Sequence, residues 1–171
     1  GIHGQYAAAG SRIVNANTFG ASAHKLAGSA YTLEQVITAG IENCKRACAP
    51  YGALTALDVG PLGELLEPSG TLAFEDAVAE YARIVKAGEA AGADLIFFET
   101  YTDLYELKAA LLAAKENTRL PILASMSFEA GGRTFTGCTV ESFAATARGL
   151  GADAVGINCS LGPKEIFPMA K

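Results

Sequence analysis

The sequence predicts an α/β fold built on a parallel β-sheet, and three observations support this. Five short, mostly apolar runs alternate along the chain with stretches in which apolar residues recur at helical spacing. The runs are apolar at most positions rather than at every second one, which is typical of parallel strands covered on both faces. Similar short junctions, at 9–11, 91–94 and 150–153, each close a helical stretch and open a run. Together these features indicate repeated β-loop-α units with right-handed crossovers.

The first units contain two predicted strands and one predicted helix. The run 12–18 (RIVNANT) is predicted to be the first strand. The stretch 33–48 has apolar residues at helical spacing, and Thr32 precedes it as a plausible N-cap. Gln35 falls at the third helical position, so the two side chains form a capping-box pattern. The run 53–59 (ALTALDV) is predicted to be the second strand.

The middle of the chain continues the alternation. The stretch 74–91 places Tyr81 and other apolar residues on one stripe, which predicts an amphipathic helix. The run 94–99 (DLIFFE) is predicted to be the third strand. The stretch 104–117 is predicted to be the next helix, with Asp103 suited to cap its N-terminus.

The last units follow the same order. The run 121–127 (PILASMS) is predicted to be the fourth strand. The stretch 140–150 is predicted to be a helix that ends at Gly151, a residue type that often follows a helix C-terminus. The run 153–159 (DAVGINC) is predicted to be the fifth strand, and 164–171 begins another helix.

Composition narrows the class of protein. The chain has 171 residues, which suits one domain, and no linker or low-complexity tract divides it. Half of its residues are hydrophobic and 18% are charged, which excludes intrinsic disorder. A net charge of −5 without a basic cluster argues against a nucleic-acid partner, and no apolar run approaches the ~18 residues of a membrane span. No signal peptide is recognisable, and four cysteines in such a chain favour a reducing, cytoplasmic location.

Two architectures accommodate these units: an open doubly wound sheet and a barrel of eight units. The dinucleotide fingerprint and the P-loop are both absent. Polar side chains stand at the C-terminal end of nearly every predicted strand: Asn15, Asn17, Thr18, Asp58, Glu99, Thr100, Ser125, Ser127, Asn158 and Cys159. In a barrel these ends converge on one mouth, where barrel active sites lie, so their positions favour the barrel.

Five segments, read together, resemble the homocysteine S-methyltransferase family, and most of all the homocysteine-binding domain of its cobalamin-dependent methionine synthases. They are 15–21, 56–77, 93–116, 123–137 and 151–163, and the likeness extends over nearly the whole chain. It implies a (β/α)8 TIM-type barrel, a zinc ion, and homocysteine as a substrate that is methylated to methionine through its thiolate. The implied methyl donor is methylcobalamin, recharged by 5-methyltetrahydrofolate, both bound by other domains of the enzyme. A betaine- or S-methylmethionine-dependent enzyme and a non-catalytic barrel piece remain as alternatives.

The sequence departs from the family pattern at the metal site. The family's zinc is held by three cysteines, one of which closes a G-x-N-C motif and corresponds to Cys159. The other two belong to a Gly-Gly-Cys-Cys-Gly motif that this chain lacks, as it lacks the strand before the helix around 3–8. We therefore expect residues 1–171 to form a partial homocysteine-binding domain with about five of eight strands. Alone it is expected to be inactive and to self-associate through open barrel edges.

The resemblance assigns roles to several residues. Cys159 is expected to ligate zinc, and Glu99 is expected to bind the amino group of the substrate. Hydrogen bonds to the amino-acid end of the substrate are expected from Asn17, Thr18 and Asn158, and Ser125 is expected to line the pocket; no residue is assigned a catalytic role. By residue type alone, the carboxylate could instead cap the following helix, and the amides and hydroxyl could cap loops.

Three further residues are expected to be structural. Asp58 stands just before the Gly-Pro pair at 60–61 and is interpreted as a cap for that turn. Cys44 and Cys48 are four residues apart on a predicted helix, which is a possible ligand spacing, but no third ligand is near in sequence. A buried helix face is therefore the favoured interpretation of this pair.

Overall fold

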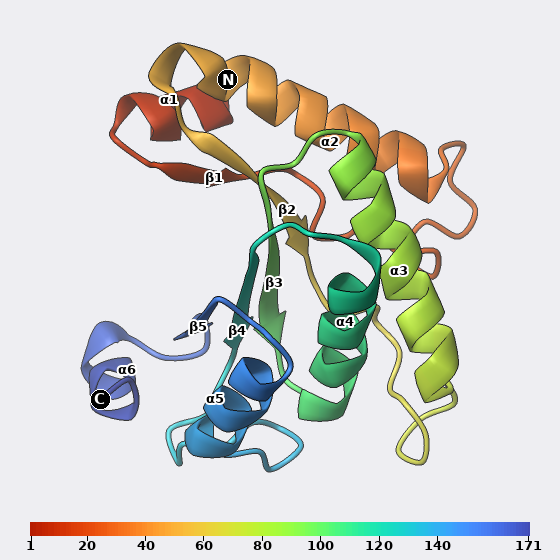
Figure 1. Ribbon diagram of the computed structural model, residues 1–171. Coiled ribbons are helices and arrows are strands. Elements are labelled where there is room, and N and C mark those ends of the chain that lie inside the picture. The colour runs from red at the N-terminus through yellow and green to blue at the C-terminus, as the bar shows by residue number, and fades with distance from the viewer.

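The computed structural model describes residues 1–171 and contains every predicted strand and helix (Figure 1). In chain order the elements are α1 (Ile2–Ala8), β1 (Ile13–Asn15), α2 (Leu33–Cys48), η1 (Ala49–Tyr51), β2 (Leu54–Val59), α3 (Phe74–Ala90), β3 (Leu95–Tyr101), α4 (Leu104–Asn117), β4 (Ile122–Met126), α5 (Val140–Gly149), β5 (Ala154–Ile157) and α6 (Pro163–Met169). The bounds of α2 and α4 match the prediction. The strands are shorter than predicted, except that β3 extends two residues further, and the 3-10 turn η1 was not predicted.

The five strands form one parallel sheet in the order β1-β2-β3-β4-β5. Each strand therefore pairs only with the strands before and after it in the chain. A doubly wound sheet instead reverses its strand order at a switch point. The sequential order is that of a barrel wall, so it confirms the barrel and excludes the doubly wound alternative.

The helices form a layer along one face of this sheet (Figure 1). Each of α1 to α4 contacts the next helix in the chain, and all five helices from α1 to α5 also contact strands. Such a layer forms when every crossover has the same hand, as parallel β-α-β units require. None of these helices has the length and hydropathy needed to cross a membrane.

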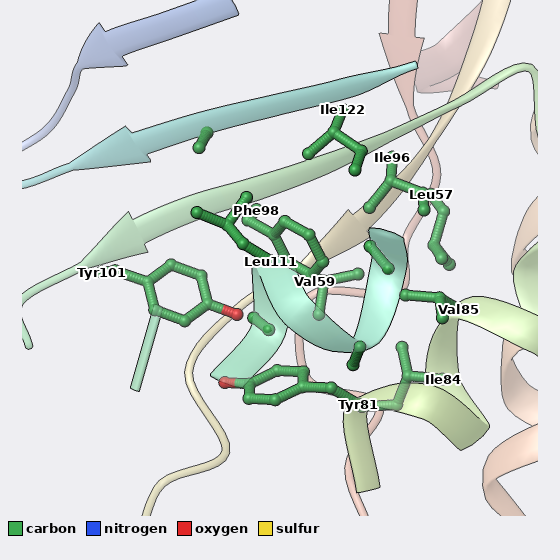
Figure 2. Packing of buried hydrophobic residues seen from close by; sticks show 14 of the residues in the cluster. Leu57, Val59, Tyr81, Ile84, Val85, Ile96, Phe98, Tyr101, Leu111 and Ile122 are labelled. Carbon is green, nitrogen blue, oxygen red and sulfur yellow. The ribbon is translucent and has the colours of Figure 1, made fainter. Parts of the chain in front are cut away.

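The core lies between the sheet and this helical layer (Figure 2). Leu57 of β2, Ile96 and Phe98 of β3, and Tyr81 and Leu111 of the helices are fully buried there. The ring of Tyr81 meets that of Phe98 edge-to-face, with centroids 6.1 Å apart. Burial of each such side chain contributes about 1.5–3 kcal/mol, which explains why apolar residues dominate these positions.

No helix covers the other face of the sheet, here called the inner face. The strand register places Ile13 and Leu54 opposite one another on it, and these side chains are 42% and 47% exposed. Most of β5 is exposed as well. The expectation of two covered faces is therefore met on one side only. In a complete barrel the inward side chains of all strands fill this space.

One irregularity interrupts the sheet at the end of β3. Phe98 pairs with Ala124, and the next pair joins Tyr101 to Met126, so three steps along β3 match two along β4. This is a β-bulge, which leaves one extra residue on β3 and reverses the alternation of its side chains beyond Phe98. Tyr101 consequently packs in the core beside Phe98, with ring centroids 6.1 Å apart. The two intervening residues, Glu99 and Thr100, are both only partly buried.

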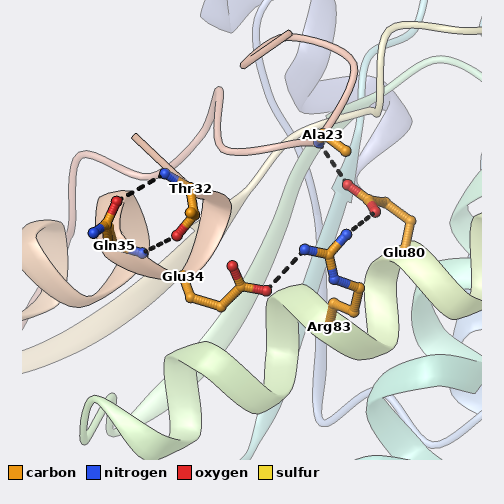
Figure 3. Close-up of polar contacts among 6 residues, drawn as sticks. All are labelled: Ala23, Thr32, Glu34, Gln35, Glu80 and Arg83. Carbon is orange, nitrogen blue, oxygen red and sulfur yellow. Dashed lines mark hydrogen bonds and ion pairs between the residues drawn. The ribbon is translucent and has the colours of Figure 1, made fainter. Parts of the chain in front are cut away.

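Polar contacts tie α2 to α3 at the surface (Figure 3). Thr32 and Gln35 form the predicted capping box, with bonds of 3.2 Å and 2.9 Å between each side chain and the other's backbone N–H. Arg83 of α3 donates to Glu34 at 2.8 Å and also contacts Glu80. These ion pairs are exposed, so solvent screening keeps their contribution small.

Thr32→Ala is expected to lower the free energy of unfolding by about 1 kcal/mol, since the helix loses a side-chain acceptor for the N–H of Gln35. Urea denaturation followed by circular dichroism measures this change. Thr32→Ser keeps the hydroxyl and is expected to retain most of the stability. Equal losses in both variants would show that the capping bond is not what stabilises the start of α2.

Candidate functional site

The polar residues of the inner face gather at the carboxyl ends of the strands, a region here called the mouth. The register of the sheet places Asp58, Phe97 and Leu123 side by side on the inner face, and Glu99 and Ser125 lie farther along the same strands. Toward the amino ends of the strands the inner face is mostly apolar. The polar mouth above an apolar floor is the arrangement of barrel active sites.

Two carboxylates lie together on one side of the mouth. Asp58 is 7% exposed, and its Oδ1 is buried without a hydrogen-bond partner. Burial, and then the nearby charge of Glu99, raise the pKa of Asp58 to about 7, while the amide of Asn15 opposes this rise. Burial likewise raises the pKa of Glu99, whose Oε2 accepts a bond of 3.3 Å from Nδ2 of Asn15. Neither carboxylate forms a salt bridge, so no cationic side chain of this chain pairs with either of them.

The predicted role of Asp58 as a turn cap is wrong. Its carboxylate makes no bond to the turn at 60–61, and it lines a cavity of about 710 Å³ together with Asn15 and Asn17. The backbone of Asp58 is held instead by Thr18, whose hydroxyl donates to the carbonyl oxygen at 2.8 Å and accepts from the N–H at 3.0 Å. The turn was predicted from neighbouring residues, whereas the residue that bonds to the backbone of Asp58 lies 40 residues earlier in the chain.

Thr18 is thus an internal brace between the loop after β1 and the end of β2. It is 3% exposed, and Gly40 of α2 lies against it so closely that a Cβ on that glycine would be 2.7 Å from Cγ2 of Thr18. Asn17, by contrast, is exposed beside the cavity, and its side chain forms no hydrogen bond within the chain. Of the two neighbours, only Asn17 has side-chain groups available to a ligand.

A second polar group surrounds Cys159 on the other side of the mouth. Asn158 donates from Nδ2 to Oγ1 of Thr100 at 2.7 Å and lies 3.5 Å from Sγ of Cys159. Its Oδ1 accepts a bond of 2.9 Å from Ser125, and its backbone oxygen accepts one of 2.9 Å from Ser127. The structure therefore brings together three residues predicted for the site, Ser125, Asn158 and Cys159, in one hydrogen-bonded cluster.

The bulge in β3 joins the two groups. Glu99 reaches toward β1 through its bond to Asn15, and the next residue, Thr100, reaches toward the end of β5 through Asn158. Without the bulge, alternation would send the second side chain into the core. One backbone segment thus places a carboxylate beside Asp58 and a hydroxyl beside Cys159.

The residues of this chain do not fit a complete zinc site. Cys159 is exposed, but no group of three His, Cys, Asp or Glu side chains is close enough to hold a metal. Cys44 and Cys48 are buried in α2, with their sulfurs 3.8 Å apart, as the helix-face interpretation expects. Cys138 lies before α5 and donates to the carbonyl oxygen of Thr139. Zinc sites in proteins take three or four protein ligands, and no such set is present here.

Sequence reasoning missed two contributors, Asn15 and Thr100, as site residues. Both are small polar residues at strand ends, and they stood among ten such residues without a motif to distinguish them. The available signal for Asp58 was a carboxylate near the end of an apolar run, which Glu99 shares on the next strand, two residues beyond the partner of Asp58.

Comparison with known proteins gives consistent results. The family model for homocysteine S-methyltransferase matches residues 1–171. The chain is 28% identical over 179 residues to a methionine synthase of Mycobacterium tuberculosis and 29% identical over 181 residues to that of Mycobacterium leprae. Each match covers 96% of this chain and 15% of the relative, so the chain spans a small part of the length of these relatives.

Solved structures show the same fold. The metallated form of the homocysteine methyltransferase MmuM from Escherichia coli superposes with a TM-score of 0.85 at 21% identity, covering 98% of this chain and 64% of that one. The apo form gives a TM-score of 0.78 at 23% identity, with 98% and 63% covered.

Proposed function

The chain belongs to the homocysteine S-methyltransferase family, and from this premise we propose that its mouth binds homocysteine and presents the thiol for methylation to methionine. The observation that carries the proposal is a pair of carboxylates, the buried Asp58 and the partly buried Glu99, neither of which has a cationic partner. Glu99 of this pair is followed directly by Thr100, which bonds to the cluster that contains Cys159. A ligand with an ammonium group at one end and a sulfur at the other matches both halves.

The ammonium end belongs at the carboxylates. An ammonium group carries three N–H donors, and the buried Oδ1 of Asp58 has no partner. A cation there would favour the ionised form of both acids and so offset the burial that raises the pKa of each. Glu99 is the proposed principal contact, and Asp58 is a second one. Asn17, exposed beside the same cavity, is proposed to donate to the substrate carboxylate.

The thiol end belongs at Cys159. This cysteine is the one soft ligand at the mouth, and we propose it as one ligand of a zinc ion whose other ligands lie outside residues 1–171. Zinc lowers the pKa of a coordinated thiol and so makes it a better nucleophile. The contribution of this chain is to hold the substrate by its amino-acid end and to fix the direction of the Cys159 side chain.

The extent of the domain supports a partial barrel. The chain covers 64% of the solved enzyme with which it shares its fold, and its sheet has two open edge strands, β1 and β5. We propose that residues 1–171 are about five of the eight units of a homocysteine-binding barrel. The methionine synthase relatives favour methylcobalamin, recharged by methyltetrahydrofolate on other domains, as the methyl donor. We also propose that the isolated chain has no methyltransferase activity, because it lacks a complete metal site, and that the protein is cytoplasmic, because its four cysteines are free.

Elemental analysis of the purified chain is expected to find well below one zinc per chain, with or without homocysteine, because one thiolate cannot hold zinc tightly. Cys159→Ser is the informative variant, and Cys138→Ser is its matched control. One zinc per chain that disappears in Cys159→Ser would contradict the incomplete site. It would show that a second copy or another side chain completes the coordination.

A further inference from the structure

Thr100 has an unfavourable backbone conformation at the centre of the mouth. Its φ is 63°, in the left-handed region that β-branched residues avoid. Cys159 and Ser160 are also left-handed, with φ of 57° and 49°, so the three non-glycine residues with positive φ all lie at this site. Strain of this kind persists where surrounding contacts over-determine the conformation, and it clusters at functional sites.

The contacts that hold Thr100 form a chain across three strand ends. Its backbone N–H donates to Oγ of Ser125 at 3.4 Å. The same Ser125 hydroxyl donates to Oδ1 of Asn158, and Nδ2 of Asn158 returns a bond of 2.7 Å to Oγ1 of Thr100. The bonds therefore close a ring among β3, β4 and the end of β5.

Two residues of this ring lie next to the sulfur of Cys159. Sγ lies 3.7 Å from Oγ1 of Thr100 and 3.5 Å from Nδ2 of Asn158. Cys159 is otherwise exposed, so these two neighbours are what restricts its side chain. The contacts already use both N–H groups of Asn158 and the hydroxyl proton of Ser125, which leaves neither residue a donor for a substrate.

We infer, on the basis of the proposed function, that Thr100 is a positioning residue that fixes the Cys159 side chain through the ring it forms with Ser125 and Asn158. Ser125 and Asn158 belong to this device rather than to the set of substrate contacts. The β3 bulge is what puts the Thr100 hydroxyl at the mouth, and the left-handed backbone of Thr100 is retained because the ring holds it.

The test is the rotamer of Cys159, measured by NMR on the full chain through the two couplings between its Hα and Hβ protons. In the wild type the couplings are expected to have the values of one fixed rotamer, either one large and one small or both small. In Thr100→Val, which removes the hydroxyl, they are expected to converge to an averaged value, and the Asn158 side-chain N–H protons to exchange with solvent at least about tenfold faster. Thr100→Ser is expected to restore the wild-type couplings and exchange.

Ser125→Ala is a second, independent variant for the same test, because it breaks the ring at a residue whose backbone is not left-handed. It is expected to average the Cys159 couplings as well. Single-rotamer couplings in both Thr100→Val and Ser125→Ala, averaged couplings in the wild type, or failure of Thr100→Ser to restore the rotamer would each overturn the inference.

These readouts need no substrate, so they separate this inference from the proposed function. Homocysteine binding to the same chain is measured separately by calorimetry. A wild-type chain that fixes Cys159 but binds no homocysteine would contradict the proposed function and leave the positioning role standing.

Discussion

Glu99→Gln is expected to weaken homocysteine binding by about 10- to 100-fold. The substitution keeps the size of the side chain but removes the charge that is proposed to meet the substrate ammonium. A hydrogen bond to a charged group is worth about 1.5–3 kcal/mol, which corresponds to this range of affinity. Isothermal titration calorimetry of the chain with L-homocysteine under reducing conditions measures the change.

Two controls make this result specific. Glu42→Gln removes a carboxylate from the exposed surface of α2 and is expected to leave affinity unchanged. 4-Mercaptobutyrate, which is homocysteine without the amino group, is expected to bind the wild type and Glu99→Gln equally weakly. Equal homocysteine affinity for the wild type and Glu99→Gln would contradict the assignment of the ammonium to this carboxylate.

Asp58 is expected to make the chain less stable as pH rises, by about 4 kcal/mol between pH 4 and pH 8. Burial raises the pKa of Asp58 from its ordinary value of 3.8 to about 7 in the folded state. Between these values the folded chain retains a proton that the unfolded chain has released, so the free energy of unfolding falls with pH. Each pH unit in this window is worth about 1.4 kcal/mol.

Asp58→Asn is expected to remove most of this pH dependence and to stabilise the chain at pH 8. Urea denaturation at pH 5 and pH 8 tests both statements. Some slope is expected to remain, because burial also raises the pKa of Glu106 and of Glu99. Asp76→Asn, on the exposed side of α3, is the matched control and is expected to keep the full slope. If Asp58→Asn retains the wild-type slope, the carboxylate of Asp58 is not the group that titrates.

Removal of the Asp58 charge is expected to change stability and homocysteine binding in opposite directions. The Asp58→Asn variant is expected to be more stable at pH 8 yet to bind homocysteine more weakly, since a neutral amide cannot pair with an ammonium group. Such opposite effects are typical of sites that hold charge in a buried place for the sake of a ligand.

Local signals made most of the fold predictable. Thr32 and Asp103 cap α2 and α4 with their own side chains, so the sequence alone located both N-termini. The order of strands and helices followed from periodicity. The residues at which strands begin and end were less predictable, because strand length depends on pairing with neighbouring strands rather than on the residues of one strand.

The site was predictable only in part for the same reason. Glu99 and Cys159 stood out in their motifs, but the bulge that sends Thr100 to the mouth arises from a one-residue mismatch between β3 and β4. No residue type within β3 predicts that mismatch. The backbone of Asp58 is likewise held by Thr18, which lies 40 residues earlier in the chain.

The sequential order of the sheet has a consequence for how the chain folds. Every strand pairs with its immediate predecessor in the chain, so each new pairing closes a loop no longer than one β-α unit. Loop closure of this kind costs little additional entropy from one unit to the next. The sheet can therefore grow from β1 to β5 in the order of synthesis. Shortening it from the β5 end is expected to remove pairings one at a time and to leave the pairings nearer the N-terminus in register.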